Sequence, residues 1–265
     1  MKAKQATLPT QKDKAEAFRK LHLKGSPLIL FNIWDAGSAR MVEQAGAKAI
    51  ATSSWSVATA NGFADGEKIP FTAALGNLER IAATVNLPVS IDLESGYTTD
   101  HAVLIENIRK VIAVGAIGIN FEDQIVGGEG LYPVEDQCAR IRAIREAADQ
   151  TSIPLFINAR TDVFLKSYPA KHDEAQLDQA VRRAEAYARA GASGLFAPGL
   201  RDPGLIKNLC ELSPIPVNIM VLPDTPSSKD LAQLGVARIS YGAESYRRMS
   251  EALTESAREA LSELS

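Results

Sequence analysis

The sequence predicts a (β/α)8 TIM barrel formed by a single domain of 265 residues. Eight short apolar segments recur along the chain, and each is followed by a segment whose apolar residues have helical spacing. The apolar segments have no polar face, which is typical of parallel strands covered by helices. No change in composition divides the chain, and this length is common for one such barrel.

The N-terminus should lie outside the barrel. We expect residues 1–10 to be a disordered tail and residues 11–24 to form a helix, because Ala15, Phe18 and Leu21 follow near-helical spacing. Residues 1–24 are polar and charged, unlike a signal peptide or a membrane anchor. No apolar run reaches the roughly 18 residues that a membrane-spanning helix needs.

The predicted strands and helices then alternate to the C-terminus. Strands are expected at residues 28–34, 49–54, 88–94, 118–122, 154–160, 194–198, 216–222 and 238–241. Helices are expected at residues 37–45, 71–85, 100–114, 134–148, 173–190, 203–212, 227–234 and 244–264. Glycine follows three of these helices, as it commonly does at helix ends: Gly46, Gly115 and Gly191.

The alternative fold is a doubly wound open sheet. Such sheets usually have fewer strands and an early Gly-rich phosphate-binding turn, and the sequence has neither a GxGxxG motif nor a Walker-type loop. The barrel is therefore preferred. No internal linker or low-complexity segment interrupts it.

Composition excludes several classes of function. The formal net charge of −3 gives no basic surface for nucleic acid or an anionic membrane. Cys138 and Cys210 are the two cysteines, and they lie far apart in the sequence without a CxxC motif. This pattern disfavours a disulfide scaffold and favours a cytoplasmic location.

Acidic residues gather where the third and fourth strands end, the edge at which TIM barrels carry their active sites. Asp92 and Glu94 point to one face of the third strand, while Glu122 ends the fourth and Arg160 the fifth. Buried carboxylates need a compensating cation, and oxygen donors without His or Cys favour Mg²⁺ or Mn²⁺. The alternatives are solvated loop acids, a helix-capping acid, or a simple ion pair between Glu122 and Arg160.

A metal and a guanidinium at one rim favour a small anionic substrate. A 2-oxo carboxylate would chelate the metal, which would stabilise an enolate as a Lewis acid. Ser53, Ser54 and Trp55 end the second strand and are candidates to bind the substrate carboxylate, or are simply a polar strand end. Asn218, at the end of the seventh strand, is a further candidate. No GxSxG motif supports a serine nucleophile.

Five segments resemble the isocitrate lyase/phosphoenolpyruvate mutase superfamily, in the same order and with similar spacing. Residues 31–40 (FNIWDAGSAR) with 43–46 (EQAG) resemble its first βα unit. Ser53 with Asp65 twelve residues later, and residues 92–97 (DLESGY), resemble its substrate and Asp-x-Asp-Thr-Gly-Tyr metal motifs. Residues 120–124 (NFEDQ) and 158–162 (NARTD) resemble its next two elements.

The resemblance implies a Mg²⁺-dependent enzyme that forms or cleaves C–C or P–C bonds through a 2-oxo-acid enolate. It implies that Asp92 binds the metal directly and that Glu94 and Glu122 hold metal-bound waters. Arg160 and Asp65 are the implied catalytic residues, and Tyr97 is a further catalytic candidate from its place in the sequence. The substrate would be bound by Ser53, Ser54, Trp55 and Arg160. Family members are usually tetramers that exchange the last helix, which would be residues 244–264.

Two departures from the family pattern limit the choice of substrate. The lyases that cleave isocitrate or 2-methylisocitrate carry a Lys-Lys-Cys-Gly-His loop after the fourth strand, and the phosphonopyruvate enzymes carry a Lys-rich loop there. Residues 125–131 (IVGGEGL) contain no Cys, Lys or His. Glu94 also stands where Asp is usual, a change that water-mediated contact tolerates better than direct ligation.

The sequence therefore predicts a Mg²⁺-dependent lyase that cleaves a C–C bond of a small 2-oxo acid or related carboxylate, resembling oxaloacetate decarboxylase or isocitrate lyase. P–C bond chemistry, as in phosphonopyruvate hydrolase or phosphoenolpyruvate mutase, is the first alternative. A barrel that binds a 2-oxo acid without turning it over is the second. The general acid or base stays open among Tyr97, Glu129 and Tyr241.

Overall fold

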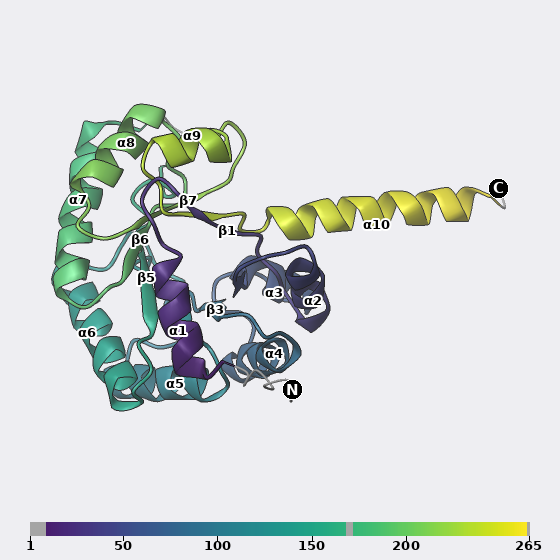
Figure 1. Ribbon diagram of the computed structural model, residues 1–265, viewed down its shortest axis with the longest axis horizontal. Coiled ribbons are helices and arrows are strands. Elements are labelled where there is room, and N and C mark those ends of the chain that lie inside the picture. Colours follow the sequence, from purple (N-terminus) through teal and green to yellow (C-terminus); the bar gives the residue numbers. More distant parts are fainter. Residues whose placement is uncertain (1–8, 168–171, 264–265) are drawn as a thin grey trace, which may run out of the picture.

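The computed structural model describes residues 9–167 and 172–263 and contains the predicted barrel (Figure 1). Its parallel strands are hydrogen-bonded in the order β1-β8-β7-β6-β5-β4-β3-β2, and a bridge between Ile33 and Thr52 joins the two ends. The (β/α)8 fold is confirmed. The strands are β1 Leu28–Leu30, β2 Ile50–Ala51, β3 Val89–Asp92, β4 Gly118–Glu122, β5 Phe156–Arg160, β6 Gly194–Phe196, β7 Val217–Met220 and β8 Arg238–Ser240.

Helices follow the strands as predicted, and several begin at an acidic N-cap. The side chains of Asp35, Asp100 and Asp173 accept hydrogen bonds from backbone N–H groups in the first turns. The helices are α1 Gln11–Lys20, α2 Ala36–Gln44, α3 Ser54–Ala60, α4 Phe71–Thr84, α5 His101–Ala113, α6 Val134–Gln150, α7 Glu174–Arg189, α8 Pro203–Leu212, α9 Ser228–Gln233 and α10 Glu244–Ser262. Most of the expected tail, residues 1–8, and the expected helix end at 264 lie outside the described residues.

Helix α3 was not predicted from the sequence. The second strand ends at Ala51, and Ser53 is the N-cap of α3, with its hydroxyl accepting a hydrogen bond from the Ser56 N–H group at 3.4 Å. Val57 and Ala58 then bury one side of the helix. Ser54 and Trp55 are thus held by helical backbone geometry.

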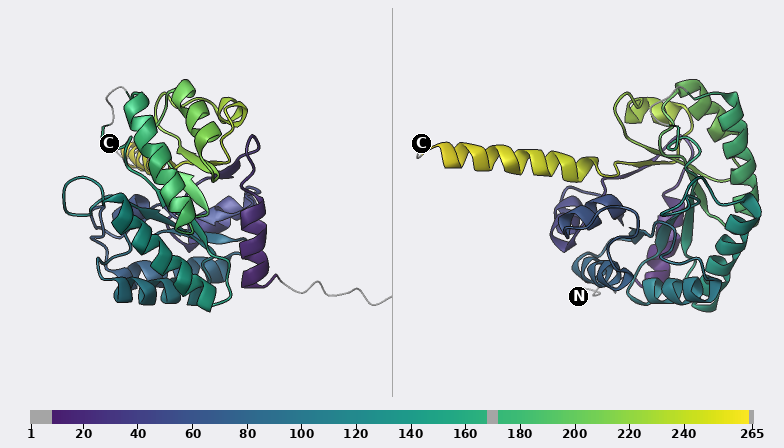
Figure 2. Two further views of the ribbon diagram at one scale, coloured as in Figure 1. Left: turned by 90° about the vertical axis from the view of Figure 1, so that its left-hand side faces the viewer. Right: turned by 180° about the vertical axis from the view of Figure 1, so that it is seen from behind.

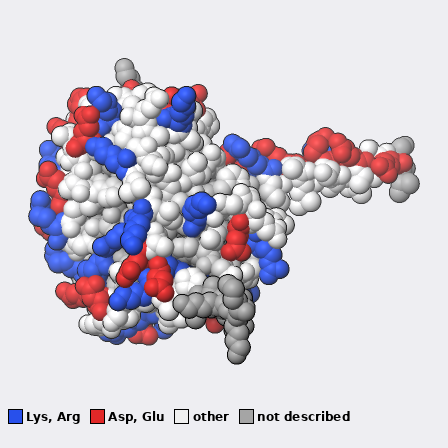
Figure 3. All heavy atoms as spheres, viewed as in Figure 1, with Lys and Arg blue, Asp and Glu red and all other residues white. Residues whose placement is uncertain are grey.

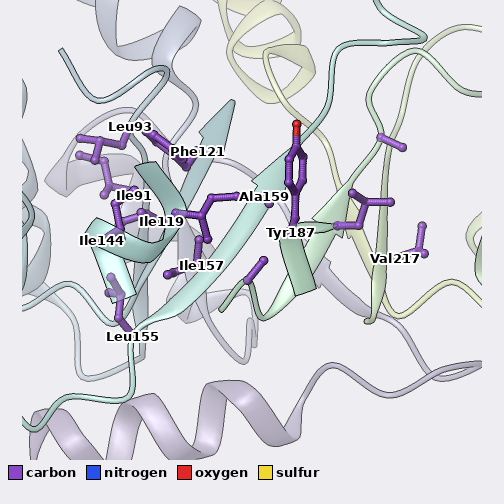
Figure 4. Close-up of a cluster of buried hydrophobic side chains, with 14 of the residues drawn as sticks. Ile91, Leu93, Ile119, Phe121, Ile144, Leu155, Ile157, Ala159, Tyr187 and Val217 are labelled. Atoms are coloured by element: carbon purple, nitrogen blue, oxygen red, sulfur yellow. The ribbon is translucent and has the colours of Figure 1, made fainter. Parts of the chain in front are cut away.

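The strand register separates an apolar outer layer from a polar interior. Ile91, Ile119 and Ile157 are in register on β3, β4 and β5, and they belong to the core between the barrel and its helices (Figure 4). Because side chains alternate along a strand, the next residues face the opposite side. Asp92, Asn120 and Asn158 are in register there, so the same pairing that builds the core also aligns polar groups.

Helix α1 closes the N-terminal end of the barrel (Figure 2). Ala15 and Phe18 on α1 are fully buried against a second apolar cluster that includes Leu30, Ile117 and Phe156. This packing fills the end of the barrel opposite the predicted active site.

Helix α10 projects away from the barrel (Figures 1 and 2). Of its described residues, only Ser245 is buried, while Leu253 and Leu261 are 65% and 76% exposed. The middle residue of β1, Ile29, is 47% exposed between two buried leucines. Next to it lies a mainly apolar groove of about 510 Å³, lined in part by Leu21, Leu23, Phe31 and Val42. One part of the barrel wall is therefore not covered by this chain's own helices.

On the face of the barrel shown in Figure 3, lysine and arginine are interspersed with aspartate and glutamate. Within residues 9–167 and 172–263, none of the helices has the length and apolar character needed to cross a bilayer.

Candidate active site

A cavity of about 270 Å³ opens at the C-terminal ends of the strands. This is the edge at which TIM barrels form active sites. The cavity contains six of the residues proposed from the sequence: Ser53, Ser54, Trp55, Asp65, Asp92 and Arg160.

Asp92 is held at the end of β3 with one carboxylate oxygen left without a partner. Its Oδ2 atom accepts hydrogen bonds from the Ser54 N–H group at 3.2 Å and from the Ser54 hydroxyl at 3.0 Å. Its Oδ1 atom is buried and has no hydrogen-bond partner among the described residues. A buried, unpartnered carboxylate oxygen is costly, so this atom is suited to a cation.

Glu94 follows β3 in a left-handed backbone conformation, with φ of 50°. Its Oε2 atom accepts a hydrogen bond from the Glu67 N–H group at 2.8 Å, and the Tyr97 hydroxyl lies 3.5 Å from Oε1. Burial, helped by the charges of Asp92 and Asp65, raises the pKa of Glu94 to about 8. A buried carboxyl group with a pKa raised in this way needs a nearby cation to stay ionised at neutral pH.

Glu67 was missed by the sequence reasoning. Its Oε1 atom accepts hydrogen bonds from the N–H groups of Ser95 at 3.1 Å and Tyr97 at 2.8 Å. Together with the bond from its own N–H group to Glu94, these contacts tie the loop after α3 to the loop after β3. Glu67 lies only two residues after Asp65 in the sequence, but this spacing alone does not predict the contacts of Glu67 with the loop after β3.

Glu122 and Arg160 form an ion pair at the neighbouring strand ends. The Arg160 Nη1 atom lies 2.9 Å from Glu122 Oε2, and Asp162 binds the same guanidinium through two contacts of 2.6 and 2.9 Å. Burial raises the pKa of Glu122, and Arg160 opposes this change. Burial lowers the pKa of Arg160, but Asp162 and Glu122 outweigh it, so the guanidinium stays charged.

The remaining predicted residues lie at different depths. Asp65 lines the cavity, and burial and the charge of Asp92 raise its pKa. Tyr97 is not among the cavity-lining residues, and burial followed by the charge of Glu94 raises its pKa. Asn218 lies in the barrel interior, where its Oδ1 atom accepts a hydrogen bond from the Ser240 hydroxyl at 3.2 Å. The structure thus brings Asp65 to the cavity but not Tyr97 or Asn218.

A second residue that sequence reasoning missed is Arg238, which is 1% exposed at the start of β8. It donates hydrogen bonds to Asn120 Oδ1 at 3.1 Å and to Ser240 Oγ at 3.4 Å. Burial lowers its pKa to about 9, and the charge of Asp92 opposes this change. An arginine inside an otherwise apolar strand segment was the signal in the sequence.

The donor set fits a hydrated divalent cation. No three His, Cys, Asp or Glu side chains among the residues described converge closely enough to coordinate a metal directly. The unpartnered Asp92 oxygen could provide one direct ligand, with the buried carboxyl groups of Glu94 and Glu122 and the exposed Asp65 near it. Mg²⁺ commonly keeps several waters and takes one or two protein carboxylates, so this arrangement suits it.

Sequence comparison gives the family. The family model described as phosphoenolpyruvate phosphomutase matches residues 18–261. The chain belongs to this family. The predicted resemblance to the isocitrate lyase/phosphoenolpyruvate mutase superfamily is confirmed, and with it the prediction of an enzyme from a superfamily of lyases and mutases.

Three relatives show different degrees of similarity to this chain. A crystal structure from Burkholderia cenocepacia J2315, provisionally assigned as a phosphonomutase, is 49% identical, with a TM-score of 0.92 over 95% of this chain and 100% of that chain. An uncharacterized protein of Mycobacterium tuberculosis is 33% identical over 87% of this chain and 83% of the relative. The 2-methylisocitrate lyase of Escherichia coli is 27% identical over 89% and 81%, respectively.

Proposed function

We propose that this protein is a Mg²⁺-dependent lyase that cleaves a C–C bond of a small 2-oxo acid or a related carboxylate through an enolate. The observation that carries the proposal is the unpartnered, buried Oδ1 atom of Asp92 at the cavity. The similarity to 2-methylisocitrate lyase supports the class of reaction.

The chain's own residues would prepare the site in three ways. Ser54 holds one oxygen of Asp92, which fixes the other for the metal. Arg160, held by Glu122 and Asp162, provides a fixed positive charge where negative charge develops. The Ser53 hydroxyl and the Trp55 N–H group would bind the substrate carboxylate, because both Ser54 donors already bond Asp92. When bound, Mg²⁺ or Mn²⁺ would supply Lewis acidity for the enolate.

Decarboxylation of an oxaloacetate-like acid fits these residues best, because it needs no protein base. Retro-aldol cleavage needs a base to remove a hydroxyl proton. Of the three candidates, Tyr241 lines the cavity, Glu129 is exposed on the loop after β4, and Tyr97 is outside the cavity lining. Burial and the charge of Glu94 raise the pKa of Tyr97, so its phenol keeps the proton and is not available to accept another.

P–C bond chemistry is the alternative that the comparisons favour, through the family description and the provisionally assigned phosphonomutase. A transferred phosphoryl group carries charge that enzymes commonly stabilise with Lys or Arg as well as metal. Among the described residues that line the cavity there is no lysine, and of the two arginines Arg160 is already paired with Glu122 and Asp162. Non-catalytic binding of a 2-oxo acid is the second alternative.

A substrate panel tests the proposal. Oxaloacetate, 2-methylisocitrate and phosphonopyruvate would each be supplied with Mg²⁺ and with EDTA, and the products identified by NMR. We expect Mg²⁺-dependent C–C cleavage and no phosphate or phosphoenolpyruvate from phosphonopyruvate. If phosphonopyruvate alone reacts, P–C chemistry replaces the proposal. If nothing reacts while oxalate still binds, the chain is a binding protein.

The projecting α10 and the apolar groove beside β1 support a homo-oligomer, a dimer or tetramer, in which copies exchange the last helix. The apolar residues of α10 would then cover the uncovered part of a second barrel. A cytoplasmic location is also part of the proposal, supported by Cys138 and Cys210, which are both buried and unpaired.

A further inference from the structure

Two guanidinium groups line the cavity, and they differ in how their charge is compensated. Arg160 is bound by Glu122 and Asp162, so its charge is already paired. Arg247 comes from the second turn of α10, and its guanidinium lies over the Trp55 ring, 5.0 Å from the ring centre. Among the residues described, the Arg247 side chain makes no ion pair or hydrogen bond. The cavity thus has one uncompensated protein cation within the described chain.

Glu244, the lining acid that is nearest to Arg247 in the sequence, is engaged elsewhere. The Oε1 atom of Glu244 accepts a hydrogen bond from Arg248 Nε at 2.8 Å. Aromatic packing fixes the base of α10, because Tyr246 makes edge contacts with Trp34 and Trp55 at ring-centre distances of 5.0 and 6.0 Å. Arg247 is therefore held at the cavity and remains available to an anion that comes from outside the protein.

The rest of the wall is apolar where β5, β6 and β7 end. This part of the cavity is lined by Leu165, Phe196, Met220, Val221, Leu222 and Pro223. A ligand that reaches both the Asp92 side and Arg247 must therefore place uncharged carbon against this wall.

We propose that Arg247 binds a second carboxylate of the substrate, so that the enzyme acts on dicarboxylic 2-oxo or 2-hydroxy acids. The inference rests on the proposed function, which assigns the first carboxylate to the metal side. A guanidinium pairs with a carboxylate through two parallel hydrogen bonds, and one cation suffices for one such group. A phosphonate dianion carries one charge more than a carboxylate, and Arg160 is already paired with Glu122 and Asp162, so one uncompensated guanidinium favours the carboxylate.

Lactate and malate form the matched ligand pair for the test, since malate adds a second carboxylate to the same 2-hydroxy acid. Binding to the full-length protein would be measured by calorimetry with Mg²⁺, with oxalate as the reference ligand. We expect R247Q to weaken malate binding by about 10- to 100-fold, the usual range for hydrogen bonds to charged groups. Oxalate and lactate binding should change less than about twofold, and R247K should fall between. R248Q is the matched control and should bind malate normally.

The other outcomes separate the two proposals. Equal weakening of oxalate and malate in R247Q would place Arg247 on the first carboxylate and overturn the inference, as would unchanged malate binding. If phosphonopyruvate binding depended on Arg247 more strongly than oxaloacetate binding, the second group would be a phosphonate and the dicarboxylate assignment would be wrong. Failure of wild-type protein to bind oxalate with Mg²⁺ would overturn the proposed function itself, and the inference with it.

Discussion

At the scale of single residues, Asp92 combines a structural and a chemical task. Its backbone N–H group donates to Thr52 at 2.9 Å and its Oδ2 atom is held by Ser54, so the structural contacts leave the Oδ1 atom for the proposed metal. This division would fix the ligand before the metal binds and so reduce the reorganisation that binding requires.

We expect D92N to fold and to lose Mg²⁺-dependent oxalate binding, because the amide keeps the shape of the side chain but not its charge. D92A should lose the binding as well, by at least about 100-fold, a large effect expected for a direct ligand. Calorimetry with oxalate would measure this, and D136N, a change in the first turn of α6, is the control. Unchanged oxalate affinity in D92N would exclude Asp92 as the metal ligand.

His22 offers a test of pH dependence away from the site. Its ring stacks on Phe156 with a centroid distance of 4.0 Å, Nδ1 donates to the Phe18 carbonyl at 2.9 Å, and Nε2 has no partner among the described residues. Burial, with a contribution from the charge of Arg238, lowers its pKa to about 3. The folded state therefore keeps His22 neutral at pH values where the unfolded state takes up a proton.

Because the folded pKa lies below the ordinary value of 6.5, His22 costs no stability above that pH and destabilises the fold as pH falls from 6.5 toward 3. Between pH 7.5 and 5.5 the unfolding free energy should fall by about 1.4 kcal/mol more in wild type than in H22F. Urea denaturation at both pH values measures the difference. Equal pH dependence in the two proteins would show that His22 ionises freely in the folded state.

At the scale of elements, α6 stabilises the loop that carries the paired acids. Arg140 on α6 is 2% exposed and donates to the carbonyl oxygens of Ser95 and, at 3.0 Å, Thr98. Its guanidinium lies between the rings of Phe121 and Tyr132, 4.8 and 4.5 Å from their centres. The segment after Glu94 thus depends on a helix about 40 residues later in the chain.

R140M should destabilise the protein by about 2–4 kcal/mol, since it leaves buried carbonyl groups without donors. The exposed Arg142 lies on the same helix, and R142M should change the unfolding free energy by less than about 0.5 kcal/mol. Urea denaturation of both variants is the measurement. A similar small effect for the two substitutions would show that the loop does not depend on Arg140.

Periodicity predicted the elements well where burial repeats regularly, as in the isoleucines of β3, β4 and β5. It failed at α3, because Ser53, Ser54 and Trp55 carry no apolar repeat and the helix depends on a cap and two buried residues. Short sequence motifs predicted that Asp65, Asp92 and Arg160 would lie together, and all three line one cavity. Three residues that the sequence did not indicate make contacts between segments distant in the chain: Glu67, Arg238 and Arg247. The spacing of residues within one sequence does not predict such contacts.

At the scale of the whole molecule, the barrel and α10 leave complementary apolar surfaces. Met249, Leu253 and Leu261 lie at intervals of four and eight residues on α10 and are all exposed. Helical geometry places such residues on one side, and Figure 3 shows this uncharged side along the projecting helix. The barrel exposes Ile29 beside the apolar groove. Exposed apolar surfaces of this kind usually mark an interface.

If copies exchange α10 as proposed, L253D and I29D should each give monomers although they lie on different surfaces, because the exchange would bring the α10 of one copy onto the β1 region of another. E255K, an exposed change on α10 that leaves the apolar side intact, should keep the wild-type mass. Sedimentation equilibrium measures all four proteins. Dissociation by only one of the two apolar changes would argue against α10 covering β1, and a monomeric wild type would contradict the exchange altogether. Because Arg247 lies at the base of the same helix, the monomers would also reveal whether malate binding depends on assembly.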